Sequence, residues 1–545
     1  MKKHLPLFIL LILAFIPMLD FFYPGLPLTH DGQDHVARIA SFYQSLVEGN
    51  LIPRWAGNLN WGYGHPILMF LYPLSSYTAS FFHILGLDLV NSIKVVFVIS
   101  FVFSGLSMYL WISSLWGRKA GLVSGLLYMF APYHFVDIYV RGAIGENLAF
   151  VWPPLICYFA YTLSKKVKYR HLLGLALSFA ALILSHNALS IMFFLPIIGY
   201  MVFLVIESNN KKLTAFCFLL SSIIGLGLSA FFWIPAYFEG KYTLRDIVTK
   251  NNITGFVENI QRLIWFPWSY DGADNIPVQL GIMQWIIILI SPLVIWFFRR
   301  KKMSFWKFLV FLLFIFWVSI FMILPVSRPL YNVFPALQKL QFSWRFLSLA
   351  IFTPAIFVGA LIYLFPDRIG TLFTSIIVIG ILLLNKNYWH AQSYLYQNES
   401  FYQGIYNGTT DTGESAPRWS VRFMEKRPKS HIEVIDGQAN IKEIKRNTNE
   451  HQYEINTTTK TRIRENTLYF PGWQVLIDNQ PSAIEFQDEH NRGLITFFVK
   501  PGKHVVTVKF GETKLRLVSD IISFMSLLFL IGTFFFKKRI LNISK

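Results

Sequence analysis

Apolar stretches separated by short polar segments make up most of the chain. A helix needs about 20 apolar residues to cross the hydrocarbon core of a bilayer, and about twelve of the stretches approach that length. The pattern therefore predicts an α-helical polytopic membrane protein with about twelve transmembrane helices. The expected spans are 5–22, 89–113, 119–136, 143–163, 170–186, 188–206, 213–237, 277–298, 304–325, 343–365, 369–386 and 516–536.

One further stretch, 66–85, decides which side of the membrane every later loop occupies. It begins with Pro66, contains Pro73 and is rich in Ser and Tyr, which favours a surface or re-entrant helix. If it does not cross, the basic clusters fall on the cytoplasmic side, as the positive-inside rule requires. We therefore expect a cytoplasmic N-terminus. The clusters are Lys2-Lys3, Arg118-Lys119, Lys165-Lys166, Lys211-Lys212, Arg299 to Lys302, Arg368 and Lys537 to Arg539.

The composition changes abruptly after residue 386. Segment 387–515 is polar and contains short alternating runs typical of β-strands, separated by turn signals such as Asn479-Gln480 and Pro501-Gly502. We predict a transmembrane domain (1–386) with a first exterior loop (23–88), an exterior β-sandwich-like domain (387–515), and a final transmembrane helix with a basic tail (516–545). The predicted strands are 432–435, 467–470, 474–477, 494–499 and 504–510.

Composition agrees with this class: 54% of the residues are hydrophobic and 14% are charged, where a soluble protein has nearer a quarter charged. The net charge of +19 comes from short clusters between apolar runs, which indicates cytoplasmic loops and no nucleic-acid partner. Cys157 and Cys217 both lie inside apolar runs, so no disulfide framework is expected. Trp55 and Trp61, in the first exterior loop, are expected to be interfacial anchors.

The first exterior loop carries the densest group of titratable residues, directly after the first span. A helix that begins near Asp31 places Asp31, Asp34, His35 and Arg38 on one face, because they lie three or four positions apart. We interpret this face as the catalytic edge of a membrane enzyme. The alternative is that Asp31 caps the helix and Asp34 interacts with its dipole, but capping does not require His35 or Arg38.

Other charged residues stand beside predicted spans on the same side. Arg141 and Glu146 occupy a short turn, where they form either a mutual salt bridge or a phosphate-binding site. His186 interrupts an apolar stretch and could simply end a helix. Arg345 either extends to the interface or binds an anionic head group.

The order of several motifs resembles a known bacterial family. The motifs are the Asp31–Arg38 cluster, Trp61 to Pro66, Arg141 to Glu146, Ser185 to Asn187, Gln341 to Phe346, Leu468 to Val475 and Pro501 to His504. Together they resemble the integral membrane proteins related by name to 6-pyruvoyl-tetrahydropterin synthase, which are similar to glycosyltransferases of the GT-C fold. The pterin name is not taken literally, because the histidines lack the spacing of a zinc site.

The resemblance implies a GT-C-like fold and a polyprenyl-phosphate-linked sugar donor in the membrane lipid, with a glycan or protein acceptor. It also implies an acidic residue in the first exterior loop, which Asp31 matches best and Asp34 second. Such enzymes often use a divalent metal such as Mg²⁺ or Mn²⁺, with Asp31 and Asp34 as its candidate ligands here. The sequence lacks an adjacent pair of acids at this position.

We therefore predict a membrane glycosyltransferase acting on the non-cytoplasmic face, with catalytic residues Asp31, Asp34 and His35. The expected binding residues for the donor phosphate or substrate are Arg38, Arg141, Glu146, His186 and Arg345. One alternative is a transporter or flippase of a lipid-linked glycan, for which internal repeats and polar groups at mid-membrane would be expected. Another is a non-catalytic envelope scaffold that binds through the β domain.

Overall fold

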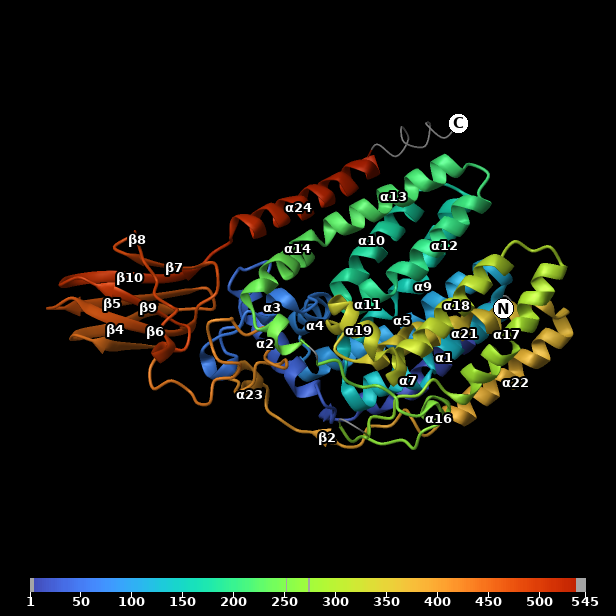
Figure 1. Cartoon of the computed structure of the whole chain (residues 1–545), viewed down its shortest axis with the longest axis horizontal. Helices are drawn as coiled ribbons and strands as arrows, with labels where there is room; N and C mark the ends of the chain where they lie inside the picture. The colour runs from blue at the N-terminus through green and yellow to red at the C-terminus, as the bar shows by residue number, and fades with distance from the viewer. Residues whose placement is uncertain (1–3, 251, 273–274, 536–545) are drawn as a thin grey trace.

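The structure is a computed structural model that describes residues 4–250, 252–272 and 275–535. It consists of a large helical bundle with a β-sandwich at one end, and the first helix lies toward the opposite end of the bundle (Figure 1). The basic residues Lys2, Lys3 and Lys537 to Arg539, which contribute to the predicted orientation, lie outside the described residues, as does the rest of the tail 536–545.

Within the described ranges, nine helices are long and apolar enough to cross a membrane. Their positions agree with the predicted spans, and the mostly helical architecture is confirmed. They are α1 with η1 (Leu5–Phe22), α5 (Leu89–Trp116), α11 with α12 (Asn187–Glu207), α13 (Lys211–Leu228), α17 (Ile282–Arg300), α18 (Trp306–Ile323), η7 with α21 (Ser343–Leu364), α22 (Asp367–Asn385) and α24 (described as a span over Lys514–Gly532). A shorter apolar helix, α10 (Tyr169–Ser185), packs between α9 and α13.

The stretch 66–85 does not form a continuous helix. It is divided into α3 (Ile67–Phe70) and α4 (Leu74–Ile84), with the break just before Pro73. The 11 residues of α4 rise about 16 Å, roughly half the hydrocarbon thickness. This segment packs against α2 and α5 and is too short to cross, as predicted from its prolines.

The predicted spans 119–136 and 143–163 are also interrupted. Short helices replace them, since Pro132 and Pro153 each fall in the first turn of a new helix and cannot occupy a helix interior. The elements are α6 (Arg118–Met129), α7 (Pro132–Phe135), the π-helical turn η3 (Val136–Arg141), α8 (Ile144–Ala149) and α9 (Trp152–Lys165). The connection between α6 and α9 thus places polar residues of η3 and α8 inside the bundle.

The β-rich region forms two antiparallel sheets of a sandwich before α24. The three-stranded sheet has the order β3-β6-β9, and the five-stranded sheet has the order β4-β5-β10-β7-β8. Trp55 from the bundle inserts into the sandwich core, with its ring centroid 5.4 Å from that of Trp473. The strands are β3 (Ile432–Asp436), β4 (Ala439–Arg446), β5 (Glu450–Thr457), β6 (Thr461–Leu468), β7 (Trp473–Ile477), β8 (Gln480–Ser482), β9 (Leu494–Val499) and β10 (Gly502–Phe510).

Buried ion pairs join the sandwich to the bundle. Arg54, in the loop after α2 (Gly32–Val47), donates to Glu512 at 2.9 Å and to Asp520 of α24 at 2.6 Å. Arg516 of α24 donates to Glu239, which follows α14 (Ala230–Phe238), at 2.8 Å. The C-terminal connection of the sandwich to the helices is therefore held by ion pairs.

A second ionic cluster lies inside the bundle around Glu146 of α8. One carboxylate oxygen of Glu146 accepts from Arg141 at 2.8 Å and from Arg345 of η7 at 3.0 Å, and the other accepts from the Tyr133 hydroxyl at 2.9 Å. Arg141 also contacts Asp137. All of these groups are buried, and the cluster connects α7, η3, α8 and η7.

Removal of the Glu146 charge should destabilise the bundle. In a Glu146→Gln variant Arg141 keeps Asp137 but Arg345 loses its carboxylate, and breaking a buried pair costs about 3 kcal/mol or more. We expect a clear fall in the melting temperature, measured by intrinsic fluorescence in detergent. Glu258→Gln is the control, because Glu258 pairs with Arg328 on the surface and such pairs contribute about 1 kcal/mol or less. Equal melting temperatures for both variants would contradict the structural role of Glu146.

Cysteine labelling tests the predicted orientation. In a background in which Cys157 and Cys217 are replaced by Ala, single cysteines are placed at the exposed positions Thr459 in the sandwich and Lys301 after α17. We expect a membrane-impermeant maleimide to label position 459 in intact cells and position 301 only after permeabilisation. Labelling of both positions in intact cells, or of position 301 alone, would contradict the orientation.

Candidate functional site

Asp31 stands at the N-terminus of α2, but its side chain does not cap the helix. The hydroxyl of Thr29 accepts from the Gly32 N–H at 3.1 Å instead. Backbone hydrogen bonds from the Asp31 N–H to the Arg141 carbonyl (2.9 Å) and from the His30 N–H to the Val140 carbonyl (3.0 Å) hold this turn against η3. The capping interpretation of Asp31 is therefore wrong, and its carboxylate is available for another role.

Close packing around the turn requires a glycine at position 142. Gly142 has a φ of +71°, and a Cβ there would lie 2.3 Å from the Thr29 hydroxyl oxygen. The turn that presents Asp31 is thus fitted directly to the connection between η3 and α8.

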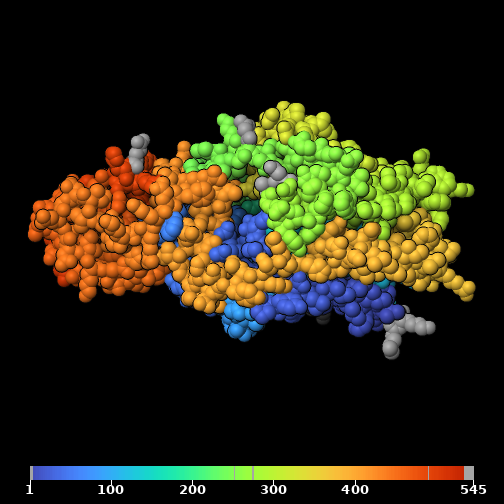
Figure 2. Space-filling view, turned by 90° about the horizontal axis from the view of Figure 1, so that it is seen from below, coloured from blue at the N-terminus to red at the C-terminus, as the bar shows by residue number. Residues whose placement is uncertain are grey.

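The Asp31 carboxylate is accessible to solvent although protein surrounds it on most sides. Figure 2 shows a hollow in this face of the molecule, with N-terminal residues (blue) inside it and later segments (green and orange) around its rim. Burial raises the pKa of Asp31, and the nearby guanidiniums of Arg141 and Arg38 oppose this effect. In the described part of the chain, no hydrogen bond or ion pair engages the carboxylate.

The two residues predicted to support Asp31 differ in their surroundings. Asp34 is half-buried and accepts a hydrogen bond from the Tyr406 hydroxyl at 2.7 Å. His35 is buried, and burial together with the Arg38 charge holds its pKa well below the usual range. His35 is therefore neutral at pH 7 and cannot serve as a proton donor in its charged form.

Arg38 is buried one helical turn after Asp34. Its guanidinium donates to the side-chain and backbone oxygens of Thr410 and lies 3.2 Å from Nδ1 of His35. None of the described carboxylates lies within ion-pair distance of it. A buried guanidinium without such a partner favours an anionic ligand.

The other predicted phosphate-binding residues interact mainly with one another. Arg141 and Arg345 both pair with the carboxylate of Glu146. Of the two alternatives for Arg141 and Glu146, the structure thus contains the mutual salt bridge. Burial would raise the pKa of Glu146, but the two guanidiniums hold it well below the usual range. His186 lies 3.8 Å from Glu146, and burial lowers its pKa to about 3, so it is neutral. Its Nδ1 accepts from the Leu189 N–H and caps α11.

The loop that covers α2 was not predicted from the sequence. This covering loop, residues 404–415, supplies Tyr406 to Asp34 and Thr410 to Arg38. Asp411 stabilises it by accepting from the N–H groups of Gly413 and Ser415, and it lies 3.5 Å from His65. The loop lies about 370 positions from α2 in sequence, and only its Gly- and Thr-rich turn composition could have indicated it.

Tyr72 was missed as well. Its ring packs against His186 with centroids 5.0 Å apart, and Gly145 leaves the space that the ring occupies, since a Cβ there would lie 2.1 Å from it. The charges of Arg38, Glu146, Arg345 and Asp31 all act on its hydroxyl, whose pKa is raised mainly by burial. Tyr72 thus lies between the Asp31 turn and the Glu146 cluster.

The residues around Asp31 do not fit a resident Mg²⁺ or Mn²⁺ well. Such ions need oxygen ligands, and Asp34, the second candidate ligand, already accepts from Tyr406. The guanidiniums of Arg38 and Arg141 would also repel a cation beside Asp31. No group of three or more His, Cys, Asp or Glu side chains with metal-binding geometry occurs among the residues that the structure describes.

Comparison with known proteins places the chain in a family. A model for the 6-pyruvoyl-tetrahydropterin synthase related domain, described as a membrane protein, matches residues 68–393, a range that begins after the Asp31 turn. An uncharacterized protein of Lactococcus lactis subsp. cremoris (strain MG1363) is 24% identical over 285 residues, which cover 49% of this chain and 46% of that protein. The match thus spans less than half of the relative's length.

Two solved structures have a similar arrangement over part of their length. The arabinofuranosyltransferase AftD from Mycobacteria is 12% identical, with a TM-score of 0.43 over 71% of this chain and 27% of that chain. ArnT from Cupriavidus metallidurans, bound to undecaprenyl phosphate, is 14% identical, with a TM-score of 0.42 over 73% of this chain and 67% of that chain. Because the family model matches more than half of the sequence, this chain belongs to the 6-pyruvoyl-tetrahydropterin synthase related family of membrane proteins.

Proposed function

We propose that this protein is a GT-C-like membrane glycosyltransferase that transfers a sugar from a polyprenyl-phosphate-linked donor to an envelope acceptor on the non-cytoplasmic face. The observation that carries the proposal is the Asp31 carboxylate. It is accessible to solvent, has no hydrogen-bond partner among the described residues, and lies near the buried guanidinium of Arg38. A base and a nearby cation that has no paired carboxylate match the needs of transfer from a phosphate.

In the proposed reaction, Asp31 accepts the proton of an acceptor hydroxyl. The hydroxyl oxygen forms a bond to the anomeric carbon of the donor sugar while the bond from that carbon to the phosphate oxygen breaks. The lipid phosphate departs with the electron pair. A carboxylate with a raised pKa is a stronger base than an ordinary one, and it is still ionised when the pH exceeds that pKa.

Arg38 is the proposed binding residue for the departing phosphate. Arg141 and Arg345 were equal candidates, but both form ion pairs with Glu146, and Arg141 forms a second one with Asp137. Arg38 keeps its positive charge without a paired carboxylate, and charge-assisted hydrogen bonds to a phosphate are among the stronger ones. Arg141 and Arg345 then act by holding η3, α8 and η7 in place around the hollow.

Replacement of Asp31 by Asn should abolish transfer while the fold is kept. The amide has nearly the same shape but cannot accept the proton, and general-base catalysis contributes about 10²- to 10⁴-fold. The measurement is turnover of a labelled polyprenyl-phosphate sugar by the purified protein in nanodiscs. Asp436→Asn, which changes an exposed carboxylate of the sandwich, is the control and should retain full activity.

The same assay separates the alternatives. Translocation of the labelled lipid without transfer would support a flippase, and binding alone would support a scaffold. Full turnover by Asp31→Asn, with an unchanged melting temperature, would remove Asp31 from the mechanism.

The pH dependence of kcat/KM should show one acidic limb set by Asp31. The carboxylate must be ionised to act as a base, so activity should fall about tenfold per pH unit once the pH drops below its pKa. Because burial raises that pKa above the ordinary value of 3.8, the limb should lie above pH 3.8. Undiminished kcat/KM at pH 4, in protein shown to be folded by its fluorescence, would contradict the role of Asp31 as base.

A further inference from the structure

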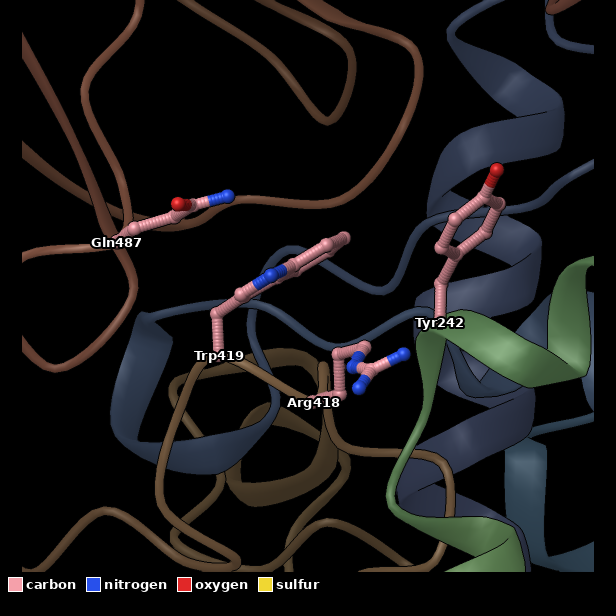
Figure 3. Close-up of a pocket in the computed structure, with 4 residues that line it drawn as sticks. All are labelled: Tyr242, Arg418, Trp419 and Gln487. Atoms are coloured by element: carbon pink, nitrogen blue, oxygen red, sulfur yellow. The ribbon is translucent and has the colours of Figure 1, made fainter.

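A second cleft lies where the β-sandwich meets the helical bundle. It has a volume of about 400 Å³ and is lined by Tyr242, Arg418, Trp419 and Gln487, within the range of about 300 to 1,000 Å³ typical of ligand sites. The Trp419 indole lies between Gln487 and Tyr242, and the three come from separate segments of the chain (Figure 3). The cleft is lined by none of Asp31, Asp34, His35 and Arg38.

Aromatic rings form one side of the cleft in a fixed arrangement. The rings of Tyr242 and Trp419 are stacked with centroids 6.0 Å apart and an angle of 24° between their planes. Trp419 also packs edge-on against Tyr469 and Phe486, which stack on each other at 3.7 Å. Its neighbours thus fix the orientation of the half-buried indole. A ligand that stacks on it therefore loses little free energy in ordering this side chain.

The polar groups of the cleft have no partners in the protein. For the described residues, no hydrogen bond or ion pair engages the Arg418 guanidinium, the Trp419 indole N–H, the Gln487 amide or the Tyr242 hydroxyl. The backbone nevertheless fixes their positions, because the Arg418 N–H donates to the Tyr242 carbonyl at 2.9 Å. Donors and acceptors are therefore arranged around an aromatic face with their hydrogen-bonding capacity unused.

The cleft also has a positive charge that nearby acids do not compensate. The Lys241 ammonium lies 5.0 Å from the centroid of the Tyr242 ring and adds to the charge of Arg418. The closest acids in sequence to Gln487, Glu485 and Asp488, both pair with Arg462, at 2.9 and 3.1 Å. An anionic ligand would thus meet cations without having to displace a carboxylate.

We propose that this cleft is a carbohydrate-binding subsite for an anionic glycan, one whose sugars bear carboxylate or phosphate groups. The C–H groups of a sugar ring would pack on the negative face of the indole, the amide and indole N–H would bind hydroxyls, and Arg418 would bind the anionic group. An acidic peptide is less well matched, because the cleft offers a single aromatic platform and no series of pockets for successive side chains.

The chain that follows the covering loop leads directly to this cleft. Thr410, which binds Arg38, and Arg418 lie eight positions apart in one continuous segment, so their Cα atoms are separated by at most about 28 Å. A glycan of several sugars could therefore occupy both places. This link to transfer rests on the proposed function, whereas binding at the cleft does not.

Titration calorimetry on the full chain in detergent micelles tests the proposal. The probes are oligogalacturonate, a phosphorylated malto-oligosaccharide, neutral maltoheptaose and a polyglutamate peptide of similar charge. We expect one or both anionic saccharide probes to bind more tightly than maltoheptaose and polyglutamate, and the better of the two identifies the anionic group. Arg418→Gln and Trp419→Ala should each weaken this binding about tenfold or more, as expected for loss of a charged hydrogen bond or a stacking platform.

Arg427→Gln and Trp265→Ala, which change exposed residues of the same types elsewhere, should leave binding unchanged. Absence of binding by the wild-type chain, equal binding of maltoheptaose or polyglutamate, or unchanged binding by Arg418→Gln would overturn the subsite. Arg418 is exposed, so its variant should fold even if Trp419→Ala does not. Asp31→Asn should bind the glycan normally, so a failure of the transfer mechanism and a failure of this subsite are distinguishable.

Discussion

A guanidinium buried away from bulk water is costly unless an anion lies against it, and this constraint organises the bundle around Glu146. Its carboxylate contacts Arg141, Arg345 and Tyr133, which belong to three separate elements. These contacts fix η3 and α8, and the backbone of η3 in turn holds the turn that carries Asp31. The position of the candidate base thus depends on a charge cluster to which its backbone is hydrogen-bonded but with which its carboxylate forms no hydrogen bond.

Charged side chains that have a partner of opposite charge can be distinguished from those that have none. Charges that are compensated by a buried partner stabilise the fold, whereas Asp31 and Arg38 are left with no partner of opposite charge within ion-pair distance among the described residues. The sandwich repeats the pattern at its base, where Arg54 and Arg516 are paired with acids and Arg418 has no such partner. Both proposed sites are thus places where polar groups are held in position but not satisfied by the protein.

The hydropathy pattern predicted most of the helices, including the failure of 66–85 to cross, because span length and proline position are local properties. It missed the breaks in 119–136 and 143–163, although Pro132 and Pro153 mark them in the sequence. In the sandwich, β3, β7, β9 and β10 agree with prediction. The predicted run 467–470 captured only the end of β6, and β4 and β5 were not predicted, because their charged side chains alternate with few apolar residues.

The candidate site shows the same division. The helical spacing of Asp31, Asp34, His35 and Arg38 was readable from the sequence, and the structure brings them together on α2. The sequence did not show which arginine lacks a carboxylate partner. That depends on the contacts of Glu146 and on Thr410, which lies 372 positions from Arg38. Trp55 was expected at the membrane interface but lies in the sandwich core. This contact was not predicted because its partner Trp473 is also remote in sequence.

The most direct test of the account is an experimental structure of the full chain in nanodiscs with a bound polyprenyl phosphate. We expect the phosphate to contact the Arg38 guanidinium, with the Asp31 carboxylate facing the same space and Glu146 still paired with Arg141 and Arg345. A phosphate bound at the opposite end of the bundle, or one that displaces Glu146 from Arg345 and leaves Arg38 without contact, would contradict it.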